Sequence, residues 1–140
     1  MNDKFFLDTN IFIYDIHEAE KEKKNKSRAL IIQALDTQLG IISHQVIQEF
    51  INVATRKIEV TMTPEDCRLY VHRHLFPLWK INSTEQLIFK SLDIFQKYKY
   101  SFYDSLIIAS ALEASCKILY SEDLQSKQMI EGLTIINPFV

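Results

Sequence analysis

Residues 4–15 read KFFLDTNIFIYD, and the three polar residues at their centre decide the fold. Residues 5–7 are apolar without alternation, which is typical of a strand that is buried on both faces. Apolar residues resume at 11–13, so residues 8–10 stand at a single point between two buried segments. A surface loop would spread its polar residues and include Gly or Pro. The pattern predicts a strand over 4–8 that opens into a helix, at the edge where parallel sheets bind ligands.

The composition is that of an ordinary soluble globular protein, with 140 residues, 47% of them hydrophobic and 24% charged. We expect one domain over residues 1–140 and a cytoplasmic location, because no run of the sequence resembles a membrane span or a signal peptide. Cys67 and Cys116 lack metal-ligand spacing and are interpreted as buried thiols, although a disulfide remains open. A net charge of −2 gives no general reason for nucleic-acid binding, which would need a local basic patch.

Strands and helices alternate along the chain. Strands are predicted over 4–8, 40–43, 76–81, 117–120 and 133–139, and helices from about 10, over 29–35, over 43–57, from 63, over 83–98 and over 104–115. Thr63 before Pro64 marks one helix start, Ser83 with Gln86 forms a capping box, and Pro77 argues for a strand beginning or an edge. Residues 18–28, EAEKEKKNKSR, are interpreted as a solvated helical face, with RNA contact by their five basic residues as the alternative. The alternation predicts an α/β fold with a parallel sheet between helices.

Four acidic residues occupy positions that suit chemistry. Asp8 follows the first strand, Glu49 borders the apolar stripe of helix 43–57, Asp104 heads helix 104–115, and Asp123 follows strand 117–120. Taken singly, each has a plainer explanation: Asp8 and Asp104 as helix N-caps, Glu49 as a solvated rim residue, and Asp123 as a turn or cap residue. Together they would crowd four negative charges, which is costly unless a cation neutralises them. Hard oxygen ligands favour Mg²⁺ or Mn²⁺ over zinc.

Other kinds of site lack support in the sequence. His72 and His74 are two residues apart and would project to different sides of a helix, and His17 and His44 are isolated. Only two glycines occur, and neither builds a phosphate-binding loop. No Gly-x-Ser-x-Gly nucleophile motif is present. The acidic set is therefore the main candidate for a functional site.

With these residues in place, the chain resembles a PIN domain, and most closely the VapC-type toxins of bacterial toxin–antitoxin pairs. The resemblance rests on four pieces in the family's order: FFLDTNIFIY (5–14), ISHQVIQEFINV (42–53), FYDSLIIASALEASCKILYSEDLQ (102–125) and GLTIINPF (132–139). It implies a three-layer α/β/α sandwich with a central, mainly parallel sheet. The family's four acidic positions fall on Asp8, Glu49, Asp104 and Asp123, and its supporting small polar residues fall on Thr9 or Asn10 and Ser121.

The function implied is Mg²⁺-dependent hydrolysis of RNA phosphodiester bonds by an endoribonuclease, with Mn²⁺ as a substitute metal. Asp8 and Asp104 are the first choices for direct contact with one or two metal ions. Asp123 and Glu49 would bind through water, complete a second metal site or orient the attacking water. That the substrate is RNA and not DNA rests on the resemblance alone.

Two other functions stay open at this point. One is a non-catalytic PIN module that binds RNA or protein, which the intact acidic set disfavours. The other is a phosphoryl-transfer domain with Asp8 as nucleophile, which would want a second Asp where Asn10 stands. The resemblance also implies a homodimer and a small antitoxin that places a basic side chain among the carboxylates. Apolar residues of 87–103 could supply the dimer surface, or could pack in the monomer core.

Overall fold

The structure is a computed structural model that describes residues 3–59 and 61–140. The strands are β1 (Phe5–Leu7), β2 (Gly40–Ser43), β3 (Trp79–Ile81), β4 (Ile118–Tyr120), β5 (Met129–Ile130) and β6 (Leu133–Ile136). The helices are α1 (Thr9–Ile16), α2 (Lys21–Thr37), α3 (His44–Arg56), α4 (Pro64–Tyr70), α5 (Glu85–Tyr98) and α6 (Phe102–Glu113), with a π-helical turn η1 (Val71–Leu75) and a 3₁₀ turn η2 (Phe76–Leu78).

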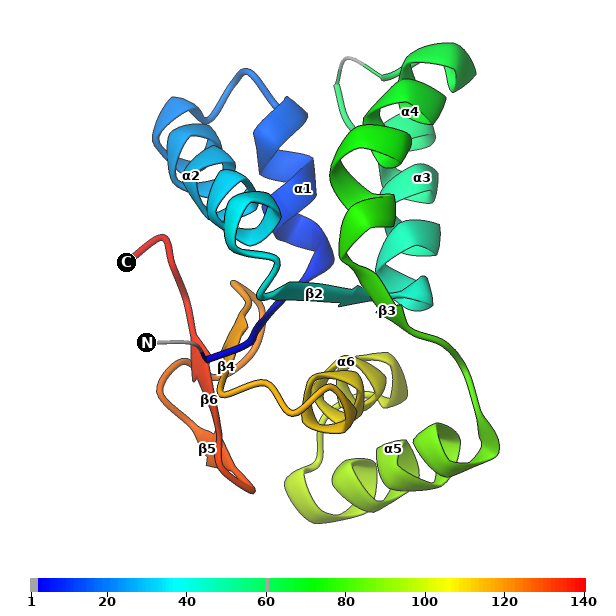
Figure 1. The fold of residues 1–140 in the computed structure, drawn as a ribbon, viewed down its shortest axis with the longest axis vertical. Coiled ribbons are helices and arrows are strands. Elements are labelled where there is room, and N and C mark those ends of the chain that lie inside the picture. Colours follow the sequence, from blue (N-terminus) through cyan, green and yellow to red (C-terminus); the bar gives the residue numbers. More distant parts are fainter. Residues whose placement is uncertain (1–2, 60) are drawn as a thin grey trace.

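The six strands form one sheet in the order β3-β2-β1-β4-β6-β5. All neighbouring pairs are parallel except β5 and β6. Helices flank the sheet: α1 to α4 lie above β2 in Figure 1, and α5 and α6 lie below it. This confirms the predicted α/β fold with a central, mainly parallel sheet between helices.

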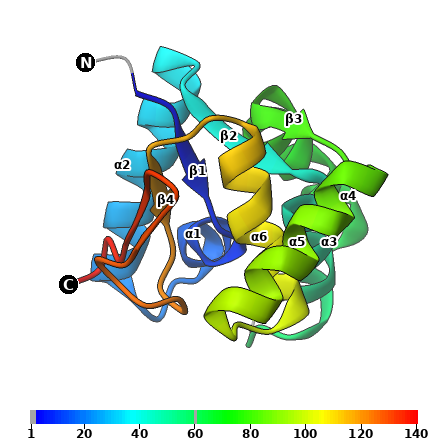
Figure 2. The ribbon, with the colours of Figure 1, turned by 90° about the horizontal axis from the view of Figure 1, so that it is seen from below.

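The first strand is the centre of the core, as its sequence predicts. All three residues of β1 are buried, because β2 and β4 pair with its two edges and helices lie on both sides of the sheet (Figure 1). Figure 2 shows α6 between the sheet and α5. That position explains why residues 105 and 107–111 of α6 are all buried, as expected for a helix that is apolar almost all round.

Glycine at position 40 allows α2 to approach the sheet. A methyl group at Gly40 would lie 2.1 Å from Cβ of Ala34, which belongs to α2. No real side-chain contact is that short, so any larger residue would force the helix away from β2. The helix itself runs from Lys21, which is eight residues before the predicted start.

The charged stretch at the start of α2 is a solvated face whose basic residues are paired with acids. Lys23 contacts Glu20 and Glu122, and Lys24 contacts Glu18. Three of its five basic side chains are therefore committed within the protein, since Arg28 also pairs with Asp15. This favours the interpretation of residues 18–28 as a solvated face over an RNA-binding patch.

A buried carboxylate joins α1, α2 and α4. The Oδ2 atom of Asp15 accepts a hydrogen bond of 2.6 Å from the Tyr70 hydroxyl, and Oδ1 accepts one of 2.8 Å from Nε of Arg28. Burial, with the neighbouring charge of Asp15, raises the pKa of Tyr70 above its ordinary value. Tyr70 also stacks on Phe50 of α3, with ring centroids 5.0 Å apart. These contacts fix the four helices on that face of the sheet.

The structure corrects several local predictions. Of the strand predicted over 76–81, only β3 is extended, because residues 76–78 form the 3₁₀ turn η2 with Pro77 in its centre. The cap of α5 is Thr84, whose hydroxyl accepts from the backbone N–H of Leu87, so the capping box at Ser83 is wrong by one residue. Cys67 and Cys116 are free and buried, as predicted, and burial raises the pKa of Cys116 to about 12. None of the helices within residues 3–59 and 61–140 combines the length and the apolar character that a membrane crossing needs.

Candidate active site at the ends of β1 and β4

The register of the sheet brings Asp8 and Ser121 together. Leu7 of β1 lies opposite Tyr120 of β4, and the backbone N–H of Asp8 donates to the carbonyl of Tyr120 at 3.1 Å. The residues that follow the two strands are therefore neighbours at the carboxyl edge of the sheet. The Ser121 hydroxyl donates to Oδ2 of Asp8 at 2.8 Å.

Asp8 caps α1 and is also a buried acid. Its Oδ1 atom accepts from the backbone N–H of Thr9 at 2.7 Å, and the residue is only 9% exposed. Burial raises the pKa of Asp8 to about 6, against the opposing effect of the hydrogen bonds from Ser121 and Thr9. The negative charges of Glu49 and Asp123 raise it further. The capping role is therefore present in the structure, and the cap is an acid that is costly to ionise.

Thr9 connects this acid to the helix α3. Its hydroxyl donates to Oε1 of Glu49 at 2.6 Å. The other oxygen of Glu49, Oε2, accepts from Nε2 of Gln45, one turn earlier in α3, at 3.2 Å. Glu49 is half-buried, as expected for a residue at the rim of the apolar stripe of its helix.

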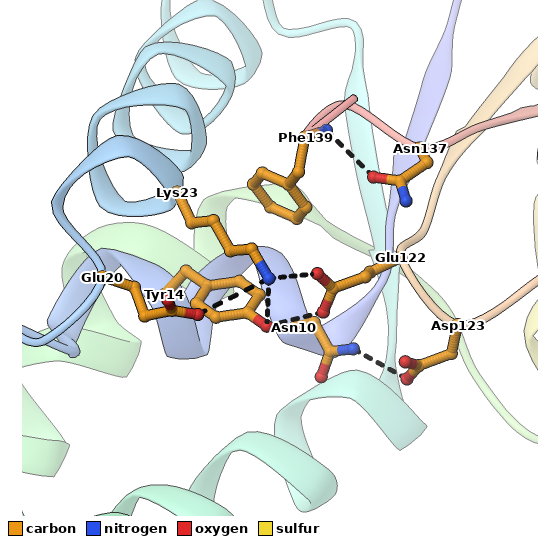
Figure 3. Close-up of polar contacts among 8 residues, drawn as sticks. All are labelled: Asn10, Tyr14, Glu20, Lys23, Glu122, Asp123, Asn137 and Phe139. Carbon is orange, nitrogen blue, oxygen red and sulfur yellow. Dashed lines mark hydrogen bonds and ion pairs between the residues drawn. The ribbon is translucent and has the colours of Figure 1, made fainter.

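Asn10 connects α1 to Asp123. Its Nδ2 atom donates to Oδ2 of Asp123 at 2.7 Å (Figure 3). Asp123 is exposed and lies in the loop after β4. The predicted supporting residues Thr9, Asn10 and Ser121 thus each hold one of the predicted acids by a hydrogen bond.

A second polar cluster anchors the same loop, and the sequence gives no sign of it. Glu122 accepts from the Tyr14 hydroxyl at 2.5 Å and from Nζ of Lys23 at 2.6 Å (Figure 3). Nζ of Lys23 also lies 4.8 Å from the centre of the Tyr14 ring and 5.7 Å from that of Phe139. These contacts fix the residue next to Asp123 to both α1 and α2.

Asp104 follows Tyr103, whose carbonyl is hydrogen-bonded to the side chain of Gln45 beside Glu49. It is the third residue of α6, it is half-buried, and its backbone N–H donates to the hydroxyl of Ser101. Ser101 is therefore the N-cap of the helix, and the capping role considered for Asp104 is wrong. The carbonyl of the preceding residue, Tyr103, accepts from Nε2 of Gln45 at 3.1 Å, and the same nitrogen contacts Glu49. The start of α6 thus lies beside the part of α3 that carries Glu49.

The chemistry of these residues fits a hard divalent cation. Their donors are carboxylate oxygens, and no ion pair to Asp8, Glu49, Asp104 or Asp123 occurs within residues 3–59 and 61–140. A carboxylate oxygen with one hydrogen bond keeps a lone pair for a metal. In the same residues, no three His, Cys, Asp or Glu side chains are already arranged around a common point that would hold an ion. Convergence of all four acids on one metal pocket stays a prediction.

Comparisons with known proteins agree with this architecture. The family model described as "PIN domain" matches residues 5–130. No functionally curated protein sequence matches the chain.

Among the solved structures that share the fold, three have a TM-score of 0.65. They are VapC20 of Mycobacterium tuberculosis, described as a sarcin-ricin loop cleaving toxin (15% identity, 86% of this chain and 90% of that one), a toxin–antitoxin complex from Klebsiella pneumoniae (22%, 96% and 98%), and FitAcB from Neisseria gonorrhoeae (14%, 96% and 98%). At such identities the likeness shows the fold alone. The family model covers most of the chain, and the chain belongs to the PIN-domain family.

Proposed function

We propose that this chain is a cytoplasmic, Mg²⁺-dependent endoribonuclease and the toxin of a toxin–antitoxin pair, with residues 1–140 forming a single PIN domain. The observation that carries the proposal is the state of Asp8. It is a buried acid at the end of the central strand, close to the charges of Glu49 and Asp123 and without a cationic side-chain partner among residues 3–59 and 61–140. The buried negative charge costs stability in such an arrangement, whereas a cation would compensate it.

In this proposal each acid has a role at the metal. Asp8 and Asp104 hold Mg²⁺ directly, and Glu49 and Asp123 act through water or at a second ion. Mg²⁺ supplies positive charge for the phosphodiester and lowers the pKa of an attacking water. The hydrogen bonds from Thr9, Asn10 and Ser121 keep three of the carboxylates oriented, so that little reorganisation is needed when RNA arrives.

RNA cleavage by purified variants tests the proposal. The wild-type chain should cut RNA with Mg²⁺ and lose that activity with a chelator. Asp8→Asn and Asp104→Asn should abolish cleavage and stay folded, because the amide keeps the shape of the side chain and loses the charge that binds metal. Asp93→Asn, at an exposed position of α5, is the matched control and should cleave normally. Cleavage at near wild-type rates by either site variant at limiting Mg²⁺ would contradict the assignment.

A non-catalytic PIN module is the second candidate, and one observation favours it. Within residues 3–59 and 61–140, no three acidic side chains already surround a common point that would hold an ion. Such a module would bind RNA equally well with and without Mg²⁺ and would cut nothing. The same assay therefore separates the two functions.

The partners that we propose are a second copy of this chain, in a homodimer, and a small antitoxin. A toxin–antitoxin complex among the structures that share the fold supports the second of these. Of the apolar residues expected to supply a dimer surface, Leu87 and Ile94 are buried in the monomer. An exposed stripe along α5 remains for the mate, formed by Ile88, Phe89, Leu92 and Phe95.

The antitoxin has a separate candidate surface. An apolar cavity of about 890 Å³ lies between α3 and α4, with Ile51, Leu69 and Phe76 among its lining residues. Its size suits the apolar face of a helix. A basic side chain of the antitoxin would pair with the carboxylates and compete with the metal. Co-expression with the neighbouring gene tests the pairing: a neighbour that neither protects growth nor co-purifies would refute it.

A further inference from the structure

A cavity of about 330 Å³ lies beside the acidic site, where β2 and β3 end and where α3 and α6 begin. Its lining includes Ser43, His44, Gln45, Asn82 and Tyr103. The volume is at the lower end of the range for small-molecule sites, so the cavity suits a single ring system and is too small for a helix. The β2–β3 register shifts between Ile42 and Ser43, an irregularity that often re-aims side chains next to active sites.

Two polar atoms in the wall of this cavity lack hydrogen-bond partners within residues 3–59 and 61–140. They are Oγ of Ser43 and Oε1 of Gln45, in side chains that are only 3% and 8% exposed. A buried polar group without a partner costs about 1–3 kcal/mol. Neither atom gains a hydrogen bond when the described chain folds, whereas a ligand in the cavity would supply one.

The orientation of the Gln45 amide follows from its neighbours. Its Nε2 atom donates to Oε2 of Glu49 at 3.2 Å and to the carbonyl of Tyr103 at 3.1 Å. The reverse orientation would set a carbonyl oxygen against two acceptors. Oε1 must therefore be the free atom, and it can only accept, whereas the Ser43 hydroxyl can donate or accept. The cavity thus calls for a ligand that carries an N–H donor beside a second polar atom.

The rim of the cavity is aromatic. Tyr103 is 66% exposed, and it lines this cavity as well as a neighbouring hollow that reaches Glu49. His44, also at the rim, stacks on Trp79 with ring centroids 5.6 Å apart. Exposed aromatic rings of this kind stack on nucleic-acid bases irrespective of sequence. Aromatic stacking with a hydrogen-bonding edge at the back is the usual combination for holding an unpaired base.

We infer that this cavity binds one nucleobase of the RNA substrate, next to the phosphodiester bond that is cut; the inference rests on the proposed ribonuclease function. The base stacks on Tyr103 and presents an N–H donor to Oε1 of Gln45, while the Ser43 hydroxyl contacts the adjacent polar atom of its edge. Both protein atoms are closed to bulk water in the free protein. The base therefore reaches them only after side chains that line the cavity shift. Gln45 then links base recognition to Glu49 of the acidic site.

A binding selection tests the inference without cleavage. A pool of random 12-nucleotide RNAs is offered to the full chain carrying Asp8→Asn, and the retained RNA is sequenced. One base should be enriched at one position. Adding Ser43→Ala should reduce the enrichment about threefold to tenfold, the value of one hydrogen bond to a buried group. Adding Tyr103→Ala should instead weaken the retention of the whole pool at least about fivefold, and Tyr103→Phe should restore that retention because stacking is kept.

Ser27→Ala is the matched control. Ser27 is likewise fully buried with an unpartnered hydroxyl, but it lies in α2 and does not line the cavity. It should leave the enrichment unchanged. Both serine variants should melt at or above the parent temperature, because each removes an unsatisfied hydroxyl.

Two results would overturn the inference: a retained pool with no enriched base, or an enrichment that survives Ser43→Ala together with a retention that survives Tyr103→Ala. The wild-type chain, given the same pool with Mg²⁺, separates this outcome from the fate of the proposed function. Cleavage without any base preference would support the ribonuclease function and refute the base-binding cavity. Base-selective binding of RNA that is never cut would support the base-binding cavity and refute the ribonuclease function.

Discussion

Asp8→Asn should stabilise the metal-free protein, and more so as the pH rises. Burial raises the pKa of Asp8 from its ordinary 3.8 to about 6. The folded state therefore binds the proton more tightly than the unfolded state, and stability is lost as the pH rises from about 4 to above 6. A difference of about 2 pH units at 1.36 kcal/mol each amounts to about 3 kcal/mol. Asparagine carries no charge and keeps the cap through its Oδ1 atom.

The measurement is urea unfolding of both proteins with a chelator present, at pH 4 and at pH 8. Effects of the amide that do not depend on pH cancel when the two pH values are compared. The advantage of Asp8→Asn over wild type should grow by about 2.5 kcal/mol between them, since a small part of the cost is already present at pH 4. Asp93→Asn, on the surface of α5, is the control and should show no comparable growth. A difference that is flat with pH would refute the claim that Asp8 sits in a desolvated, uncompensated site.

Three further outcomes are expected. Mn²⁺ at about 100 times its dissociation constant should stabilise the wild-type chain by roughly 2.7 kcal/mol, seen as a higher melting temperature that Asp8→Asn largely loses; no shift at millimolar Mn²⁺ would count against a metal site. Tyr70→Phe removes the hydrogen bond to the buried carboxylate of Asp15 and should lower the free energy of urea unfolding by about 1.5–3 kcal/mol. Tyr98→Phe should lower it far less, because the Tyr98 hydroxyl makes no hydrogen bond within the described part of the chain. Phe89→Glu, in the exposed stripe of α5, should turn the proposed dimer into a monomer, as measured by light scattering. Lys97→Glu, outside the stripe, should leave the dimer intact. A wild-type monomer at high micromolar concentration would refute the dimer proposal.

The sequence predicts the centre of the fold well because burial there is extreme. A run such as residues 5–7, apolar without alternation and followed at once by polar residues, is typical of a strand inside a parallel sheet. The spacing of apolar residues over 46–54 is typical of an amphipathic helix. The edges are harder, because local signals compete there. Thr84 and Ser83 are both good caps, and only the path of the chain after β3 decides between them.

The antiparallel strand β5 was not predicted, although a signal for it exists. Ile130 pairs with Leu133, so the turn consists of Glu131 and Gly132 alone, and both have a positive φ. That geometry is typical of two-residue hairpins and favours Gly at the second position. Two residues are too short a strand for periodicity to reveal, which leaves Gly132 as the cue.

For the site, sequence indicates which acids follow strands but not how they are held. The contact between Asp8 and Ser121 depends on the register of β1 against β4, and these strands are more than 100 residues apart in the chain. The cluster of Tyr14, Lys23 and Glu122 has no motif, since its members come from three separate elements. Gln45 is no more predictable, because its importance comes from reaching Glu49 and the start of α6 at once.

The double duty of Asp8 has an evolutionary consequence. Because asparagine is as good a helix cap and removes a buried charge, a single substitution would give a more stable protein with the same fold and no cleavage. Drift in the absence of selection for activity would therefore lead readily towards an inert descendant. Persistence of the aspartate in a lineage would then be a record of continued selection for its charge, maintained against the gain in stability that its loss would bring.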